Sequence, residues 1–368
     1  MAYTIKSQPT TPNCTYTSLV YNVSSSFASQ PQYNYIMDVY PSGSATRLAR
    51  IRQFPNPSSE AVFEPSRIFN DNMDYTLNFS SSQQLIANSV RTFELQFGEE
   101  YGTSPSSSLA VTASVVTASI EVFPCQIDPN NGTSYNFTNS ASAVILSDRP
   151  DNVEEFQGVV ERISVYNGTG GAEDVTFNYS AGGSYTTSIP AGQFYLVSYP
   201  IAAPSSGTVT VSFGSDSFIK TYNSKCSYPV YNFHFINKYG VWENFSVNLP
   251  IRGTTNLDRQ NYTQTFVNYG NGGAYDVTRR GESNYSTGIE EDLTISTNWL
   301  NEAQASWMTQ LLESDEVYVA KGDSNPDNAV FKPIVITNAS YIQNTSRKDQ
   351  KTFAYDITFR YANQRIGR

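Results

Sequence analysis

The chain has 368 residues, a formal net charge of −10 at pH 7, and charged side chains at only 15% of its positions. At roughly 150 residues per domain, this length predicts two or three domains. We do not expect nucleic acid as a partner, because phosphate binding needs clustered Lys and Arg. The small basic groups are explained better as solvated or locally paired charges: Arg47, Arg50 and Arg52, and Arg279 and Arg280.

The composition favours β-sheet. Tyr occurs 26 times and Phe 21 times, Ser, Thr and Asn are abundant, and Leu-rich helical stretches are almost absent. Residues Met1 to Ser7 lack the basic and apolar regions of a signal peptide, and no run of about 18 apolar residues occurs in the chain. We therefore expect neither secretion nor membrane insertion.

The cysteines Cys14, Cys125 and Cys226 are widely spaced and odd in number, which fits neither a disulfide framework nor the close pairs of a zinc site. We expect free thiols in a protein made in a reducing cell. Asn-x-Ser/Thr triplets, which mark glycosylation in secreted eukaryotic proteins, are interpreted here as a result of composition. They occur, for example, at Asn22, Asn78, Asn136, Asn167, Asn244 and Asn284.

Residues 1–124 are expected to form an N-terminal β-sandwich. Apolar and polar residues alternate over Ser18–Val23 and Asn34–Tyr40, and a Pro-Ser-Gly turn follows at Pro41. The alternation returns at Phe93–Phe97 and, after a Ser/Pro-rich loop, from Leu109 to Phe123. A sandwich with one buried face per sheet produces this pattern.

Residues 125–229 are richer in Gly, Ser, Thr and Asn and are expected to form a second β domain. Its predicted strands are Ala143–Leu146, Gly158–Tyr166, Phe194–Tyr199 and Thr208–Phe213. Turns are predicted at Tyr166–Gly171 and Tyr179–Tyr185, with a related Gly-Asn-Gly-Gly at Gly270–Gly273, because glycine permits the positive φ values of tight hairpins.

Residues 230–368 are expected to form an α+β domain with one amphipathic helix, Asn298–Ser314. Four apolar residues recur there at spacings of three and four and would form one stripe: Leu300, Ala303, Trp307 and Leu311. Thr297 or Asn298 can cap the start. Strands are predicted at Glu316–Ala320, Pro333–Thr337 and Phe353–Tyr361. The predicted fold class is therefore mainly β, with tandem β-sandwich-like domains followed by this α+β domain.

No catalytic constellation is predicted. His234 is the single histidine, and it lies within the strand-like alternation Tyr231–Ile236, which favours a structural position over catalysis. The chain lacks a phosphate-binding glycine motif and a dinucleotide fingerprint. Glu99–Glu100 and Glu290–Asp292 could supply two carboxylates for glycoside hydrolysis, but such acidic groups are usually solvated. We expect neither enzymatic activity nor a cofactor.

A metal site is not expected either. Asp323–Asp327 resembles the start of a calcium loop, but Asn328 stands where Gly is needed and Ile334 where Glu is needed, so a polar turn is the better interpretation. The abundance of Tyr and Asn has two explanations. These residues can bind glycans by stacking and amide hydrogen bonds, or they can build large, wet protein interfaces, and assembly is the more economical explanation.

Five segments stand out in the N- and C-terminal thirds: Arg52–Pro57, Val62–Ile68, Phe97–Ser106, Phe235–Glu243 and Leu311–Tyr318. Together they resemble virion structural proteins of tailed bacteriophages that infect Bacteroidota, and of related marine phages. The resemblance implies a non-enzymatic particle component that is assembled in the host cytoplasm. It implies placement in the tail, as a ring, hub or baseplate subunit, and it carries over no catalytic residue.

The expected partners are further copies of the chain, in a ring, and other virion proteins, because heterologous contacts either close by rotation or form filaments. The loops Phe54–Ser59 and Gly98–Ser108 are candidate contact elements, with ordinary surface loops as the alternative. The candidate interface residues are Phe54, Pro55, Asn56, Pro57, Tyr101, Pro105, Tyr239 and Trp242.

Other functions stay open. The chain could decorate a capsid or bind a host receptor through surface glycans, and a polysaccharide-degrading enzyme is the third class. These alternatives differ in their predictions. A structural subunit forms oligomers, a receptor-binding protein adsorbs to host cells, and a hydrolase releases reducing sugars until its paired carboxylates are replaced.

Overall fold

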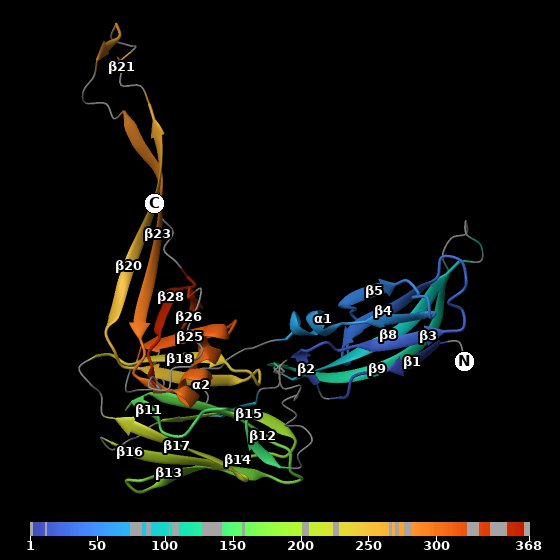
Figure 1. The fold of residues 1–368 in the computed structure, drawn as a ribbon, viewed down its shortest axis with the longest axis horizontal. Helices are drawn as coiled ribbons and strands as arrows, with labels where there is room; N and C mark the ends of the chain where they lie inside the picture. The colour runs from blue at the N-terminus through green and yellow to red at the C-terminus, as the bar shows by residue number, and fades with distance from the viewer. Residues whose placement is uncertain are drawn as a thin grey trace.

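The computed structural model describes residues 3–11, 13–73, 83–85, 90–102, 104, 110–126, 142–156, 159–200, 206–223, 228–264, 267–268, 272–275, 281–321, 331–338 and 352–363. Within them the chain is mainly β, with strands β1 to β28 and the two helices α1 and α2. Two β-sandwiches in tandem precede a C-terminal sheet that carries a helix, which confirms the predicted fold class (Figure 1). No described helix is long and apolar enough to cross a membrane.

The N-terminal domain packs a three-stranded sheet against a five-stranded sheet. The order of the first is β1 (Tyr3–Ser7), β3 (Tyr21–Ser25) and β6 (Glu60–Phe63). The order of the second is β2 (Asn13–Tyr16), β9 (Ala110–Gln126), β8 (Arg91–Tyr101), β4 (Asn34–Pro41) and β5 (Ala49–Gln53). The alternation in β8 makes much of the core, because Phe93, Leu95 and Phe97 are fully buried. Helix α1 (Ser66–Asn70) adds Phe69, whose ring stacks on Phe93 at 4.7 Å.

The middle domain is a second sandwich. One sheet has the order β10 (Ala143–Ile145), β12 (Val160–Asn167), β15 (Gln193–Pro200) and β7 (Gln83–Leu85). The other has the order β11 (Val153–Phe156), β17 (Asp216–Asn223), β16 (Gly207–Phe213), β13 (Glu173–Tyr179) and β14 (Ser184–Ile189). Gly182 and Gly183 have φ values of 99° and 94° in the turn between β13 and β14, as the sequence predicts.

Two features join the N-terminal and middle domains across the expected boundary at residue 124. Strand β7 precedes that boundary but pairs with β15, and β9 continues to Gln126. Cys14 in β2 and Cys125 in β9 form a disulfide, with Cα atoms 4.9 Å apart. The expectation of free thiols is therefore wrong for these two residues, because the parallel pairing of β2 with β9 brings together cysteines 111 residues apart in sequence. Cys226 lies outside the described residues.

The C-terminal domain is built on a seven-stranded sheet. Its order is β19 (Trp242–Val247), β18 (Tyr231–Ile236), β25 (Val317–Lys321), β26 (Phe331–Ile336), β28 (Asp356–Tyr361), β23 (Glu282–Ser296) and β20 (Ile251–Thr263). Two short antiparallel pairs accompany it: β21 (Val267–Asn268) with β22 (Ala274–Tyr275), and β24 (Leu300–Asn301) with β27 (Thr352–Phe353).

Helix α2 (Glu302–Glu313) starts later than predicted. Asn301 is its N-cap and forms a capping box with Gln304, because Leu300 and Asn301 are held in β24 instead of the first helical turn. The predictions of a cap at Thr297 or Asn298 and of Ala303 in the apolar stripe are therefore wrong, and Ala303 is exposed. The predicted Trp307 and Leu311 are buried, together with Ala305 and Met308.

Candidate functional site

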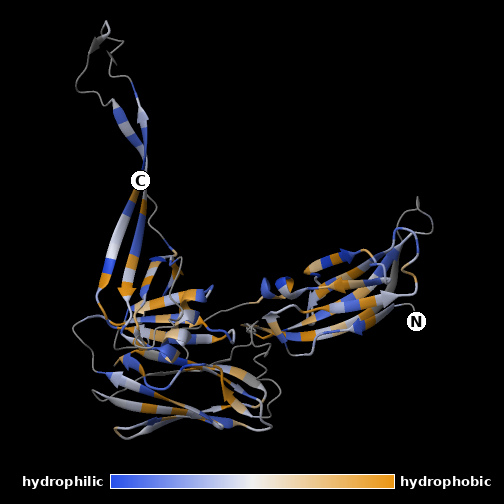
Figure 2. Ribbon diagram, viewed as in Figure 1, coloured by the Kyte–Doolittle hydropathy of each residue, from blue (hydrophilic) through white to orange (hydrophobic). Residues whose placement is uncertain are grey.

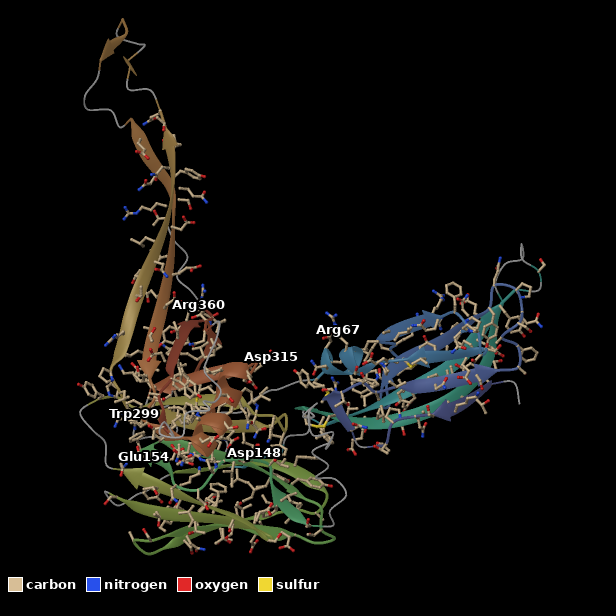
Figure 3. All side chains as sticks on the ribbon, in the orientation of Figure 1. Arg67, Asp148, Glu154, Trp299, Asp315 and Arg360 are labelled. Atoms are coloured by element: carbon tan, nitrogen blue, oxygen red, sulfur yellow. A yellow bond between two sulfur atoms is a disulfide. The ribbon has the colours of Figure 1, made fainter. Side chains whose placement is uncertain are left out.

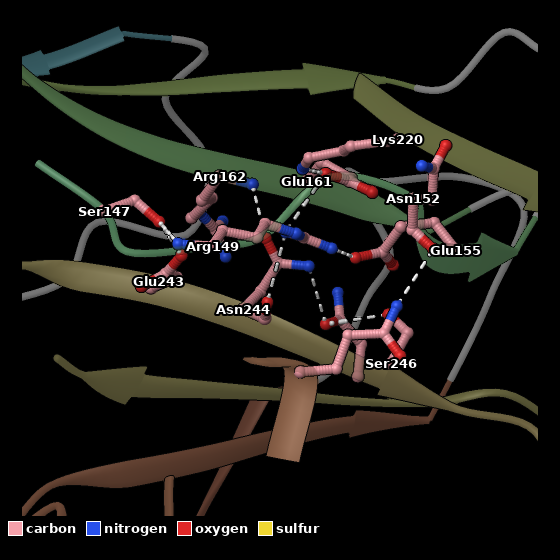
Figure 4. A network of polar contacts seen from close by, with 12 residues as sticks. Ser147, Arg149, Asn152, Glu155, Glu161, Arg162, Lys220, Glu243, Asn244 and Ser246 are labelled. Carbon is pink, nitrogen blue, oxygen red and sulfur yellow. Dashed lines mark hydrogen bonds and ion pairs between the residues drawn. The ribbon is translucent and has the colours of Figure 1, made fainter. Parts of the chain in front are cut away.

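A network of buried charged side chains lies where the middle domain meets the C-terminal domain (Figure 4). Arg149 forms ion pairs with Glu155 and Glu161, and Lys220 pairs with Glu161. Arg149 is 6% exposed, and the other three are completely buried. Glu155, Glu161 and Lys220 belong to β11, β12 and β17, so the network also ties together the two sheets of the middle sandwich.

Hydrogen bonds carry the network across to β18 and β19 of the C-terminal domain. Ser147 donates to the carboxylate of Glu243, which also accepts from Asn237 at 2.9 Å. The backbone N–H of Arg162 donates to Oδ1 of Asn244 at 2.9 Å. These contacts fix the strands of one domain against those of the other.

Burial sets the protonation of the network. His234 is completely buried, its Nδ1 lies 3.3 Å from Nη1 of Arg162, and its ring packs against Phe331 at 4.9 Å. Loss of solvent, and then the nearby guanidinium, keep the pKa of His234 well below its ordinary value, so the neutral ring accepts a hydrogen bond from Arg162. Burial lowers the pKa of Arg162 to about 10, and burial followed by repulsion from Arg149 lowers the pKa of Lys220 well below its usual value.

Helix α2 packs against the same network. The guanidinium of Arg149 lies over the ring of Trp307 at 4.9 Å, and Gln304 donates to the carbonyl oxygen of Asn152 at 3.1 Å. Removing one partner from a buried ion pair costs about 3–5 kcal/mol, because it leaves a charge without compensation in a low-dielectric interior. The middle and C-terminal domains are therefore locked as one unit.

The N-terminal domain meets that unit at a mixed hydrophobic cluster. Its buried members come from all three domains: Cys14, Phe123, Cys125, Leu146, Leu196, Val241 and Trp242. The rings of Phe123 and Phe194 lie 6.2 Å apart, and the hydroxyl of Tyr16 donates to Asp315 at 3.1 Å (Figure 3). The disulfide therefore lies at the point where the domains join.

A two-stranded arm projects from the C-terminal sheet (Figure 1). It consists of residues 254–263 of β20 and 282–292 of β23, beyond the pairing of β23 with β28. Residues of β20 after Ile251 are all exposed, and hydrophilic residues predominate in the outer part of the arm (Figure 2). Since an isolated hairpin is only marginally stable in water, such an arm gains stability from a neighbour that covers it.

Both faces of the arm carry exposed apolar or aromatic groups. Leu257 pairs directly with Ile289 and continues the row of core residues outward, although it is 51% exposed. Tyr262 and Tyr285 are 46% and 65% exposed, with ring centroids 6.3 Å apart. The hydroxyl of Tyr285 donates to Gln260 at 2.6 Å. At the base of the arm, Arg360 contacts two of its acidic side chains, Glu290 at 3.1 Å and Asp292 at 3.7 Å (Figure 3).

The predicted contact loop Phe54–Ser59 is accessible. Phe54 is 77% exposed, Asn56 and Pro57 are exposed, and Pro55 is half-buried. The Asn56 side chain accepts from the backbone N–H groups of Ser58 and Glu60 at 2.9 and 3.0 Å, which orders the turn. The loop therefore presents a large aromatic side chain on a fixed backbone.

The remaining candidate residues are less accessible. Tyr101 is half-buried and stacks on Phe27 at 5.7 Å, and Tyr239 is half-buried and donates to Asp148 at 2.5 Å. Trp242 is only 2% exposed within the mixed hydrophobic cluster. It stabilises the domain junction, so the prediction that its side chain meets a neighbouring molecule is wrong. Pro105 lies outside the described residues.

The acidic groups considered for hydrolysis are engaged elsewhere. Glu99 is 2% exposed and accepts from Ser25 at 2.6 Å and Tyr33 at 2.7 Å, while Glu100 accepts from Arg52 at 3.0 Å. The interpretation of this pair as solvated is therefore wrong. The calcium-like stretch 323–327 lies outside the described residues, and within the described part no group of His, Cys, Asp or Glu is placed to hold a metal ion.

Sequence reasoning missed the buried network and the arm. Two sequence features place charged or titratable groups where a β-strand has a buried face. Glu161 and Arg162 are consecutive inside a strand-like run, and His234 is flanked by two Phe residues. That signal could have marked the network. The arm strand was missed because Thr254–Thr263 has no alternation of apolar and polar residues. That alternation, which a buried face produces, is the sequence signal for a strand.

Comparison with known proteins gives no family for the chain. No protein-family model and no curated protein matches it. The ectodomain of the teleost fish polymeric Ig receptor is similar at 12% identity over 58% of this chain and 94% of that one, with a TM-score of 0.17. CBD12 from CALX1.2 is similar at 10% identity over 54% of this chain and 76% of that one, with a TM-score of 0.17. The I9–I11 tandem from titin is similar at 8% identity over 79% of this chain and 93% of that one, with a TM-score of 0.16.

Proposed function

We propose that the chain is a non-enzymatic structural subunit of a tailed-phage virion, a ring, hub or baseplate component of the tail that assembles through protein contacts. The arm is the observation that carries this proposal. No described residue of the chain forms a core over its exposed strands and its Leu257–Ile289 pair, and a neighbouring subunit supplies that cover. The five sequence segments that resemble virion proteins support the same assignment.

The fixed arrangement of the domains suits a structural subunit. Buried ion pairs of Arg149 and Lys220 hold the middle sandwich together and fasten it to the C-terminal sheet, and the Cys14–Cys125 disulfide reinforces the junction with the N-terminal domain. When the domains keep a fixed geometry, the contact surfaces of a subunit keep a fixed angle to one another, and that angle decides whether repeated contacts close into a ring.

Receptor binding is the second candidate, and the exposed pair Tyr262 and Tyr285 favours it. Tyrosine rings stack on sugar rings, and the flanking amide and hydroxyl groups of the arm can hydrogen-bond glycan hydroxyls. In that case the isolated chain adsorbs to host cells, and replacement of both tyrosines by Ser abolishes adsorption without changing the particle.

Immunogold labelling of purified particles tests the proposal. The particles come from the phage that encodes the chain, and the antibody is raised against the folded protein. Gold on the tail or neck is the expected result. Gold over the whole head indicates capsid decoration, and gold only on distal fibres indicates host recognition. Particles that carry no gold and lack the chain in their protein inventory overturn the proposal.

A further inference from the structure

The arm is strongly acidic. Its two described strands, residues 254–263 and 282–292, carry five carboxylates and one arginine, Arg259: the carboxylates are Asp258, Glu282, Glu290, Glu291 and Asp292. Arg360 contacts Glu290 and Asp292, so Asp258, Glu282 and Glu291 are left to attract a basic partner. The chain as a whole carries a formal charge of −10, so two copies repel one another unless surfaces of opposite sign meet. A partner for the arm therefore needs exposed basic groups.

The chain presents such a surface on β5. Within the described residues, this strand is the outermost of its sheet and pairs with β4 alone, so its other edge has no strand partner among them. Arg47, Arg50 and Arg52 lie on or beside it, with side chains 43%, 28% and 55% exposed. Leu48 at 36% exposure and Phe54 at 77% add apolar surface at its two ends.

The arm and β5 have matching chemistry. Each combines exposed apolar groups with charge, negative on the arm and positive on β5, and each includes the outermost strand of a sheet, since β20 ends the seven-stranded sheet. Open strand edges pair with other chains through backbone hydrogen bonds, and complementary charges set the register. We propose that the arm of one copy lies along β5 of a second copy. This inference rests on the proposed structural function and names its partner surface.

The two surfaces belong to different domains that lie well apart in the molecule (Figure 1). The arm projects from the C-terminal sheet, while β5 lies at the edge of the N-terminal sandwich, so one molecule cannot satisfy both. The contact is heterologous: each copy gives its arm to one neighbour and its β5 to another. Such contacts close into a ring or continue as a filament.

The arginines of β5 divide into a structural one and two that can bind an arm. Arg50 makes a bidentate pair with Asp38 at 2.6 and 2.7 Å and holds the sheet. Arg47 lies 3.6 Å from Asp38, and Arg52 contacts Glu100 through Nε at 3.0 Å. A guanidinium has five donors, so both can hold a second carboxylate while keeping these contacts.

The test is charge reversal in the full chain, followed by sedimentation velocity over a range of protein and salt concentrations. One variant carries Asp258→Lys and Glu291→Lys in the arm, and a second carries Arg47→Glu and Arg52→Glu. A matched control carries Glu173→Lys and Asp174→Lys on β13, which changes the net charge as the arm variant does. Each of the first two is expected to weaken self-association about tenfold or more, equivalent to about 1.4 kcal/mol, whereas the control is not.

Rescue makes the test specific. The fourfold variant with both reversals, and an equimolar mixture of the two double variants, are expected to associate within about threefold of the natural chain, because opposite charges face one another again. Association that is unchanged by the arm reversal, or not rescued by the combination, overturns the pairing. A natural chain that stays monomeric overturns it as well. If gold still labels the tail in those cases, the structural function stands and only the partner surface is wrong.

Discussion

Nη1 of Arg162 in the middle domain lies 3.3 Å from Nδ1 of His234 in the C-terminal domain. His234 is completely buried, and Phe331 and the strand partners Asn244 and Tyr318 surround it. Protonation of this ring would place a second positive charge beside the guanidinium. The contact therefore holds only while His234 is neutral.

This relationship predicts a pH-dependent stability. The folded pKa of His234 is lowered below 6.5, so below pH 6.5 the unfolded chain binds a proton that the folded chain does not. The contribution of this residue to stability is complete above pH 6.5 and is lost progressively as the pH falls below 6.5. Urea unfolding at pH 7.5 and 5.5 is expected to show a smaller drop for His234→Gln than for the natural chain. An equal drop in both contradicts the assignment.

A second prediction concerns the buried ion pairs. Arg149→Met leaves Glu155 buried without its cation, so the free energy of unfolding is expected to fall by about 3–5 kcal/mol. Arg360→Gln is the matched control, because the carboxylates that it contacts are partly exposed, and its effect is expected to stay below about 1 kcal/mol. Chemical denaturation followed by Trp fluorescence measures both. Equal effects of the two substitutions contradict the structural role of the network.

The third prediction concerns the disulfide. Cys14 and Cys125 enclose a long segment, 111 residues apart, so Cys14→Ala with Cys125→Ala is expected to cost about 2–5 kcal/mol of stability. Mass spectrometry gives a direct readout. The natural chain, denatured without reductant, is expected to take up one alkylating group, and three after reduction, because it has three cysteines. Uptake of three groups without reductant shows that the bond is absent.

A fourth prediction compares two glycines with positive φ. Gly43 has φ +71° and open space around the position of a Cβ, whereas at Gly214, with φ +58°, a Cβ would lie 2.7 Å from the carbonyl oxygen of Ala143. Gly43→Ala is expected to cost about 1 kcal/mol through backbone strain alone. Gly214→Ala is expected to cost about twice that or more, because its backbone neighbour cannot move aside cheaply. Thermal unfolding of both variants decides the order.

The sequence predicts elements that bury one face. Phe93, Leu95 and Phe97 alternate along β8, and Trp307 and Leu311 recur on α2, because each row faces a core within its own domain. The boundaries were less predictable. The start of α2 depends on the pairing of Leu300 with Phe353, a partner far along the chain that no local pattern reveals.

The site could be predicted only in part. Phe54 is exposed on an ordered loop, as a contact residue should be, but Trp242 is buried at a junction of three domains that a single chain pattern does not show. The Cys14–Cys125 bond depends on the parallel neighbours β2 and β9. The arm has no buried face, so the usual signal for a strand is missing from most of its length.

Complementation of a phage that lacks this coding sequence tests whether the arm makes the chain an assembly subunit. Either the natural chain or an armless variant is supplied in trans. In the armless variant, an Asn-Gly turn replaces residues 255–291 and joins Thr254 to its strand partner Asp292. A Tm for the variant within about 3 °C of that of the natural chain establishes that the rest of the protein is folded.

Electron microscopy of the lysates is the readout. Complete tailed particles are expected with the natural chain, and incomplete or untailed particles with the folded, armless variant. Complete, infectious particles from cells that supply only the armless variant would contradict this expectation.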